Sequence, residues 1–204
     1  MNSDRLKFKN SICERCNSSV TQDSDRAYDQ FILQMERSSA DAEEFYQVFS
    51  DARFCKGRGL HVYLPLFRYF AKQLGCQLAD IGAPIPLHLS KFVAKRTNRN
   101  CIWLKVNPDK AYENLSSDLA GEELKYAAHG GLVVITKAPT FLPSRLYTTL
   151  SIGQIQFIFF FVLTSLQILE MRLRYPSFVK WCAQTARTTI SNPIPSSTLQ
   201  RLGL

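Results

Sequence analysis

Residues 155–169 read IQFIFFFVLTSLQIL, and this apolar stretch decides the fold. Its unbroken apolar part, residues 157–163, is only seven residues long, whereas a helix needs about 20 apolar residues to cross a bilayer. Polar residues such as Thr164 and Gln167 interrupt the remainder. A short run rich in Phe and Ile is typical of a strand that is covered on both faces. We therefore predict a buried strand at 155–163, and we expect no membrane partner.

Three more segments upstream of this stretch have the pattern of strands, at residues 101–106, 132–136 and 146–152. Gly153 follows the last of them, and glycine is common in tight turns. We therefore predict that 146–152 and 155–163 pair as a hairpin.

Helical periodicity dominates the first half of the chain. Between residues 25 and 49 apolar side chains recur at steps of three and four, which places them on one stripe of a helix. Further helices are predicted at 60–74, ended by Gly75, at 87–96, as a single turn near 122–128, and at 178–186. This order predicts an α+β fold, with an N-terminal helical part that carries a Cys-x-x-Cys turn and a C-terminal antiparallel sheet.

We expect three parts along the chain. Residues 1–50 hold the Cys-x-x-Cys turn and the first helical region, residues 51–187 form an α+β domain, and residues 188–204, rich in Ser, Thr and Pro, form a flexible tail. Residues 1–10 are polar and charged, unlike a signal peptide. The expected location is therefore the cytoplasm.

Two of the six cysteines are closely spaced, Cys13 and Cys16, within the sequence ICERCN at residues 12–17. Two thiolates at this spacing can face one zinc ion, which prefers tetrahedral sulfur ligation. The pair is half a site, because zinc takes four ligands and the chain has no second Cys-x-x-Cys. A metal-free turn is one alternative, and a homodimer in which two half sites complete a four-cysteine centre is another. The remaining cysteines, which lie far apart, predict free thiols rather than a disulfide framework.

The residues around this pair carry a resemblance to a known family. The sequence NSICERCN at 10–17, followed by Thr21-Gln22 and by DRAYD at 25–29, resembles the end of the HNH endonuclease motif, a zinc-stabilised ββα-metal module. The resemblance implies that Cys13 and Cys16 are two of four structural zinc ligands. It also implies that Asn17 is the last residue of the motif, beside a catalytic Mg²⁺ or other divalent ion. The implied reaction is hydrolysis of a DNA phosphodiester by a water that a histidine activates.

The first half of the HNH motif is missing from this chain. Residues 1–12 contain no cysteine and no histidine, and Val20 stands where Lys or Arg is usual. Loss of the general base removes a factor of roughly 10²–10⁴ in rate. His61, His88 and His129 are the only histidines, and each is expected to be a capping, core or surface residue. We therefore expect a nuclease-family protein that is truncated at its N-terminus and inactive or weakly active alone. The alternative is a non-catalytic zinc-binding or interaction domain with a vestigial turn.

The charge of the chain favours a polyanionic partner. Its 25 basic and 17 acidic residues give a net charge of +8, which suits nucleic acid or an acidic surface. DNA is the expected partner, and an ordinary cationic surface is the alternative. Trp103 has apolar neighbours, which favour a place in the core over stacking on bases. The expected phosphate contacts come from two basic clusters: Lys56 and Arg58, beside Gly57 and Gly59, and Lys91, Lys95, Arg96 and Arg99.

Overall fold

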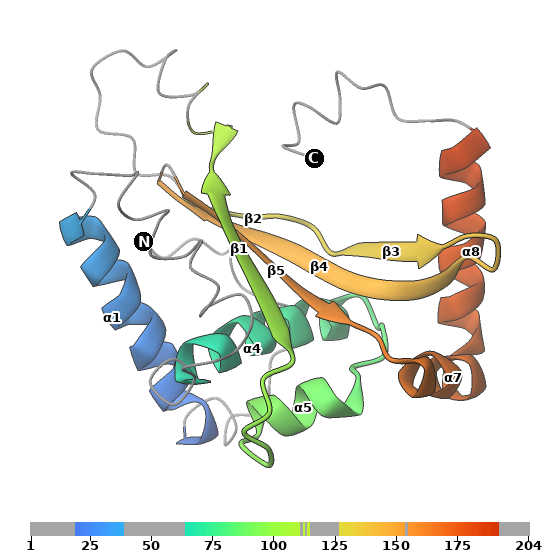
Figure 1. Cartoon of the computed structure of the whole chain (residues 1–204), viewed down its shortest axis with the longest axis horizontal. Helices are drawn as coiled ribbons and strands as arrows, with labels where there is room; N and C mark the ends of the chain where they lie inside the picture. Colours follow the sequence, from blue (N-terminus) through green and yellow to red (C-terminus); the bar gives the residue numbers. More distant parts are fainter. Residues whose placement is uncertain are drawn as a thin grey trace. The chain divides into compact units, whose positions relative to one another are not determined.

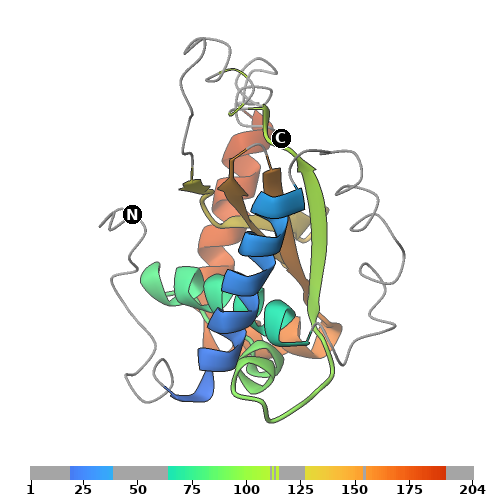
Figure 2. The same ribbon diagram turned by 90° about the vertical axis from the view of Figure 1, so that its left-hand side faces the viewer.

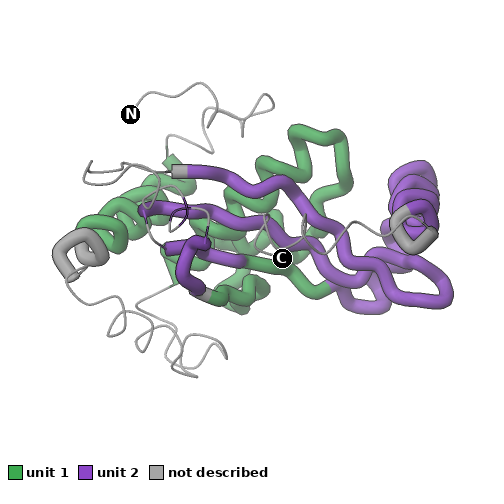
Figure 3. The backbone as a smooth tube through the Cα atoms, turned by 90° about the horizontal axis from the view of Figure 1, so that it is seen from above, with its two compact units in different colours: residues 1–105, 159–162 green, residues 106–158, 163–204 purple. Residues whose placement is uncertain are grey.

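The structure, a computed structural model, describes residues 19–38, 64–110, 112, 114, 127–153 and 155–191. The chain forms two compact units (Figure 3). Unit 1 comprises residues 1–105 and 159–162, and unit 2 comprises residues 106–158 and 163–204. The described helices are α1 (Gln22–Ser38), α4 (Leu64–Asp80), α5 (Leu87–Val93), α7 (Ser165–Arg174) and α8 (Pro176–Ser191).

The described strands form an antiparallel sheet, which confirms the predicted α+β class. Hydrogen bonds order them β1-β5-β4-β2, and β3 also pairs with β4 (Figure 1). The predicted hairpin is present, with Gly153 in its turn at φ 54°. The strands are β1 (Ile102–Pro108), β2 (Ala127–His129), β3 (Val133–Lys137), β4 (Leu142–Ile152) and β5 (Ile155–Val162).

Strand β5 contains the first part of the apolar stretch at residues 155–169. The prediction that both faces are covered is only partly right, because buried residues alternate with half-buried ones along the strand. The chain then leaves the sheet, and residues 165–174 form helix α7 instead of prolonging the strand. Among the described residues, none of the helices combines the length and the apolar character needed to cross a membrane.

In unit 1, helix α4 supplies most of the buried apolar residues. Its Phe70 ring lies 4.9 Å from that of Phe159 in β5. Helix α1 lies beside α4 (Figures 1 and 2), where the rings of Tyr28 and Tyr69 stack with centroids 3.8 Å apart. The core of this unit is built from residues of α4, α5, β1 and β5: Leu66, Phe67, Phe70, Leu74, Leu78, Leu89, Phe92, Ile102, Leu104, Phe159 and Phe161.

Helix α4 continues past the predicted end at Gly75. A side chain at that position would meet nothing within 4 Å, so the glycine imposes no turn. The helix stops where Gly82 takes a left-handed conformation with φ 67°. The Gly82 N–H donates to the Ala79 carbonyl (3.0 Å), and the Ala83 N–H donates to the Leu78 carbonyl (2.8 Å). This is the Schellman arrangement that ends many helices.

In unit 2, strands β2 and β3 pair with successive parts of β4. Gly130 lies between them, and a Cβ there would collide with the Thr149 side chain. Ala127 and Ala128 belong to β2, so the helical turn predicted near 122–128 is wrong where the structure describes it. Helix α8 packs against β4 and β3, with the Arg187 guanidinium 5.5 Å from the centre of the Phe141 ring. This helix extends five residues beyond the predicted end at residue 186.

Candidate nucleic-acid interface

Part of the predicted site lies outside the described residues: Cys13, Cys16, Asn17, Lys56 and Arg58. Within the described part of the chain, no three or more His, Cys, Asp or Glu residues cluster in a way that could hold a metal ion. The second basic cluster is fully described. Its residues, Lys91, Lys95, Arg96 and Arg99, lie at the end of α5 and in the segment that follows, and we call residues 91–99 the cationic turn.

The cationic turn begins with a Schellman arrangement like the one that ends α4. The Arg96 N–H donates to the Lys91 carbonyl (2.9 Å), and the Lys95 N–H donates to the Phe92 carbonyl (3.2 Å). The left-handed position, held by Gly82 in α4, is here occupied by Lys95 with φ 59°. A residue with a side chain pays about 1 kcal/mol or more for this conformation. Helix α5 also ends at Val93, short of the predicted residue 96.

A buried arginine of α4 fixes the backbone of the cationic turn. Arg68 is only 7% exposed. Its Nε donates to the Phe92 carbonyl (3.1 Å), and its Nη2 donates to the Thr97 carbonyl (3.3 Å) and to Asn98 Oδ1 (2.7 Å). The guanidinium also lies 5.4 Å from the centre of the Phe92 ring. The turn is therefore pre-organised by one side chain that sequence spacing does not reveal, because its partners lie 24 to 30 residues away.

Lys95 is the one member of the cationic turn with an ion pair among the described residues. Its Nζ lies 2.7 Å from Asp23 Oδ1 of α1. Partial burial acts to raise the pKa of Asp23, but the hydrogen bond and charge of Lys95, the Ser24 N–H and the charge of Arg68 outweigh it and lower that pKa. Asp23 therefore stays ionised and holds Lys95 in place.

The other three cations of the turn are exposed to solvent. Within the described ranges, Lys91, Arg96 and Arg99 have no carboxylate at ion-pair distance. The sequence between Asp80 and Asp109 contains no acidic residue at all. Among the described residues, the Asp23 carboxylate is therefore the one that pairs with a cation of the turn.

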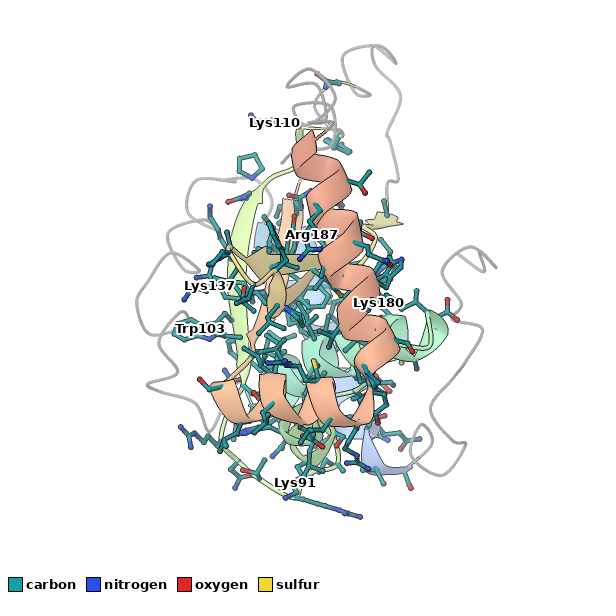
Figure 4. The ribbon with its side chains drawn as sticks, turned by 90° about the vertical axis from the view of Figure 1, so that its right-hand side faces the viewer. Lys91, Trp103, Lys110, Lys137, Lys180 and Arg187 are labelled. Atoms are coloured by element: carbon teal, nitrogen blue, oxygen red, sulfur yellow. The ribbon has the colours of Figure 1, made fainter. Side chains whose placement is uncertain are left out.

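Trp103 lies on the surface of unit 1, which corrects the prediction that it packs in the core. The residue is 44% exposed, and its ring is parallel to that of Phe160, with an interplanar angle of 8° and centroids 6.2 Å apart. Lys105, also exposed, is two residues further along β1 and so points to the same face of the strand. Figure 4 shows Trp103 along β1, with Lys91 below it in that view.

The described ionisable groups of unit 1 suit binding rather than covalent chemistry. Burial raises the pKa of the Cys101 thiol to about 12, so it is protonated at neutral pH and a poor nucleophile. Burial also raises the pKa values of the Tyr28 and Tyr69 phenols. His88 lies with Nε2 3.4 Å from the Arg99 carbonyl oxygen. The exposed cations and the exposed indole, by contrast, are accessible to a ligand.

Comparisons with protein-family models, with curated proteins and with solved structures gave no match to this chain. Its function is therefore inferred from the residues themselves.

Proposed function

We propose that unit 1 binds nucleic acid, with the cationic turn on the phosphate backbone and Trp103 stacked on a base. The observation that carries the proposal is a set of exposed cations on a backbone that buried Arg68 holds rigid. A pre-organised turn loses little conformational entropy when it binds, so its charges contribute more fully to affinity.

The stacked pair of Trp103 and Phe160 favours a nucleic-acid strand whose bases are accessible. The exposed indole shares its face of β1 with Lys105, and proteins that bind single-stranded nucleic acid without sequence preference combine aromatic side chains with positive charge in this way. Stacking contributes about 1–3 kcal/mol per base. DNA remains the expected ligand because the resemblance to the HNH family implies it.

The first experiment measures fluorescence anisotropy of a labelled single strand and of the matching duplex over a range of salt concentrations. The variant is Arg96→Gln/Arg99→Gln. Its control is Arg26→Gln/Lys137→Gln, which removes two exposed cations elsewhere and leaves the same net charge. Loss of two phosphate contacts lowers the slope of log K against log salt by about 1.4 for a single strand. An equal loss in both variants, or no binding by the wild type, would refute the proposal.

A second variant, Trp103→Leu, tests the stacking contact. We expect single-strand affinity to fall roughly tenfold, with a smaller loss for the duplex, because duplex bases are already stacked. The salt slope stays unchanged, since no charge is removed. A drop that is equal for the two ligands would assign Trp103 a structural role.

The HNH-like lineage is part of the same proposal, and it predicts binding without efficient cleavage. Cys13 and Cys16 would hold a structural zinc ion, and Asn17 would lie beside a divalent ion. Zinc content is measured in the wild type and in Cys13→Ser/Cys16→Ser: one zinc per chain indicates ligands from the same chain, and one per two chains indicates a shared site in a homodimer. Metal-dependent nicking that Asn17→Ala abolishes would disprove the predicted inactivity.

A further inference from the structure

Helix α7 presents its apolar side to solvent. Leu166, Leu169 and Leu173 are 79%, 51% and 73% exposed, whereas Met171 is buried. At about 100° per residue, the three leucines fall within an arc of about 60°, opposite Met171. Isolated exposed leucines are common, but three on one stripe mark a surface made to be covered. We call these three residues the leucine stripe.

The orientation of α7 is fixed at its start. Thr164 and Gln167 form a reciprocal capping box, in which each side chain bonds to the backbone N–H of the other. Met171 is the residue that α7 buries in unit 2. A helix anchored in this way cannot rotate its leucines inward without losing both its cap and that contact.

Helices α7 and α8 together carry a net positive charge. Helices α7 and α8 carry four cations, Arg172, Arg174, Lys180 and Arg187, and one carboxylate, Glu170. That carboxylate is already paired with Arg174 at 2.9 Å. Figure 4 shows Lys180 and Arg187 along α8, with α7 crossing its lower end.

We propose that the leucine stripe docks onto the surface of an anionic lipid bilayer, with the leucines at the boundary between headgroups and acyl chains. A helix with apolar residues on one side and Lys or Arg beside them binds such surfaces by lying in the interface plane. Tyr175 and Trp181, both exposed, are residues that favour the headgroup region. The helix does not span the membrane, so its short length is no obstacle, and the proposal replaces the expectation of no membrane partner that was drawn from the same stretch of sequence.

The charges favour this occupant over a second copy of the chain. Two copies joined through α7 would bring the same net positive charge of α7 and α8 together, which is repulsive, whereas anionic headgroups complement it. Leu166 and Leu173 are 79% and 73% exposed, so a fluid bilayer can close around them. The proposal uses unit 2 alone and does not depend on nucleic-acid binding by unit 1.

Vesicle flotation tests the proposal with the full chain. The vesicles contain phosphatidylcholine alone or phosphatidylcholine with phosphatidylglycerol. We expect binding to the anionic vesicles and a loss of about 100-fold in partitioning for Leu166→Ser/Leu173→Ser, roughly tenfold for each leucine. The control, Leu33→Ser/Leu87→Ser, changes two other exposed leucines, in α1 and α5, which are 52% and 53% exposed, and it should bind like the wild type.

The charge component is tested with Arg172→Gln/Lys180→Gln. Each cation near an anionic surface contributes about fivefold to binding, so binding to anionic vesicles falls about 25-fold. Wild type that stays unbound, or leucine variants that bind normally, would overturn the proposal. A concentration-dependent dimer in light scattering that Leu166→Ser/Leu173→Ser abolishes, without vesicle binding, would overturn it too and assign the stripe to a second copy.

Discussion

In helix α4 the apolar residues face inward, whereas in helix α7 the leucine stripe faces outward. Helix α4 even buries two cations, Arg68 and Lys72, each with polar partners. The Lys72 Nζ lies 2.8 Å from both carboxylate oxygens of Asp25 in α1. Periodicity alone would place both helices with their apolar sides inward. The two helices differ in their contacts: α4 gives its buried cations polar partners, whereas the residue that α7 buries is Met171.

The two helices therefore have different structural roles. Helix α4 organises unit 1, because its buried charges tie α1 and the cationic turn to one scaffold. Helix α7 packs against α8 and β4, buries Met171 and is capped at its start, and its leucine stripe is exposed. The two proposed binding surfaces therefore differ in kind: exposed cations on a backbone held by Arg68 in unit 1, and exposed leucines in unit 2.

The largest expected difference comes from apolar truncation in the two helices. Phe70→Ala removes a fully buried ring from α4 and should cost about 3–5 kcal/mol of unfolding free energy. Leu173→Ala in α7 removes an exposed side chain and should stay within about 0.5 kcal/mol. Urea unfolding of both variants measures the contrast. A large loss for Leu173→Ala would mean that the leucine stripe is already covered.

The next prediction compares the stability of variants at Arg68 in α4 and at Arg172 in α7. Arg68→Met leaves the carbonyls of Phe92 and Thr97 without their donor and should cost about 2–4 kcal/mol. Arg68→Lys restores the charge but not the planar fork, so it should recover less than half of that loss. Arg172→Met, in the exposed part of α7, should leave stability unchanged. Equal stability of Arg68→Lys and the wild type would contradict the role of the guanidinium in fixing the turn.

The two units should also respond to acid in different ranges of pH. Burial lowers the pKa of His129 in β2 below 6.5, so the unfolded chain binds a proton first, and unit 2 loses stability as the pH falls from about 6.5. Asp23 in unit 1 has a pKa lowered below 3.8. The stability that ionised Asp23 contributes to unit 1 is present above pH 3.8 and is lost only as the pH falls through the lowered pKa.

Amide hydrogen exchange between about pH 8 and pH 3 follows each unit separately. His129→Gln should remove the loss in the upper range, and Asp23→Asn should remove the loss in the lower one. Opening free energies in β2, obtained after division by the pH-dependent intrinsic exchange rates, that do not change with pH down to the carboxyl range would exclude His129 as the cause.

Much of the fold follows from local patterns, and most of the site does not. The α+β class and the hairpin at Gly153 were readable because turn chemistry and alternation act over a few residues. Helix α7 was not predicted, although Thr164 and Gln167 have the spacing of a capping box, because the apolar residues before it favoured a strand. Arg68 could not be assigned, because its partners are set by tertiary packing. The exposure of Trp103 depends likewise on which face of β1 the helices cover, and alternation does not determine that.

The smallest expected effect compares the ends of α4 and α5, where the same turn holds Gly82 in one helix and Lys95 in the other. Lys95→Gly relieves about 1 kcal/mol of backbone strain and loses an exposed ion pair worth about 0.5 kcal/mol. The variant should therefore be slightly more stable than the wild type at low salt, and more clearly so at high salt, where the pair is screened. Nucleic-acid affinity should fall, since one cation of the turn is gone.

The reciprocal change, Gly82→Ala, should destabilise at both salt concentrations because no ion pair is involved. If Lys95→Gly were destabilising even at high salt, the lysine would hold the turn through contacts other than its charge.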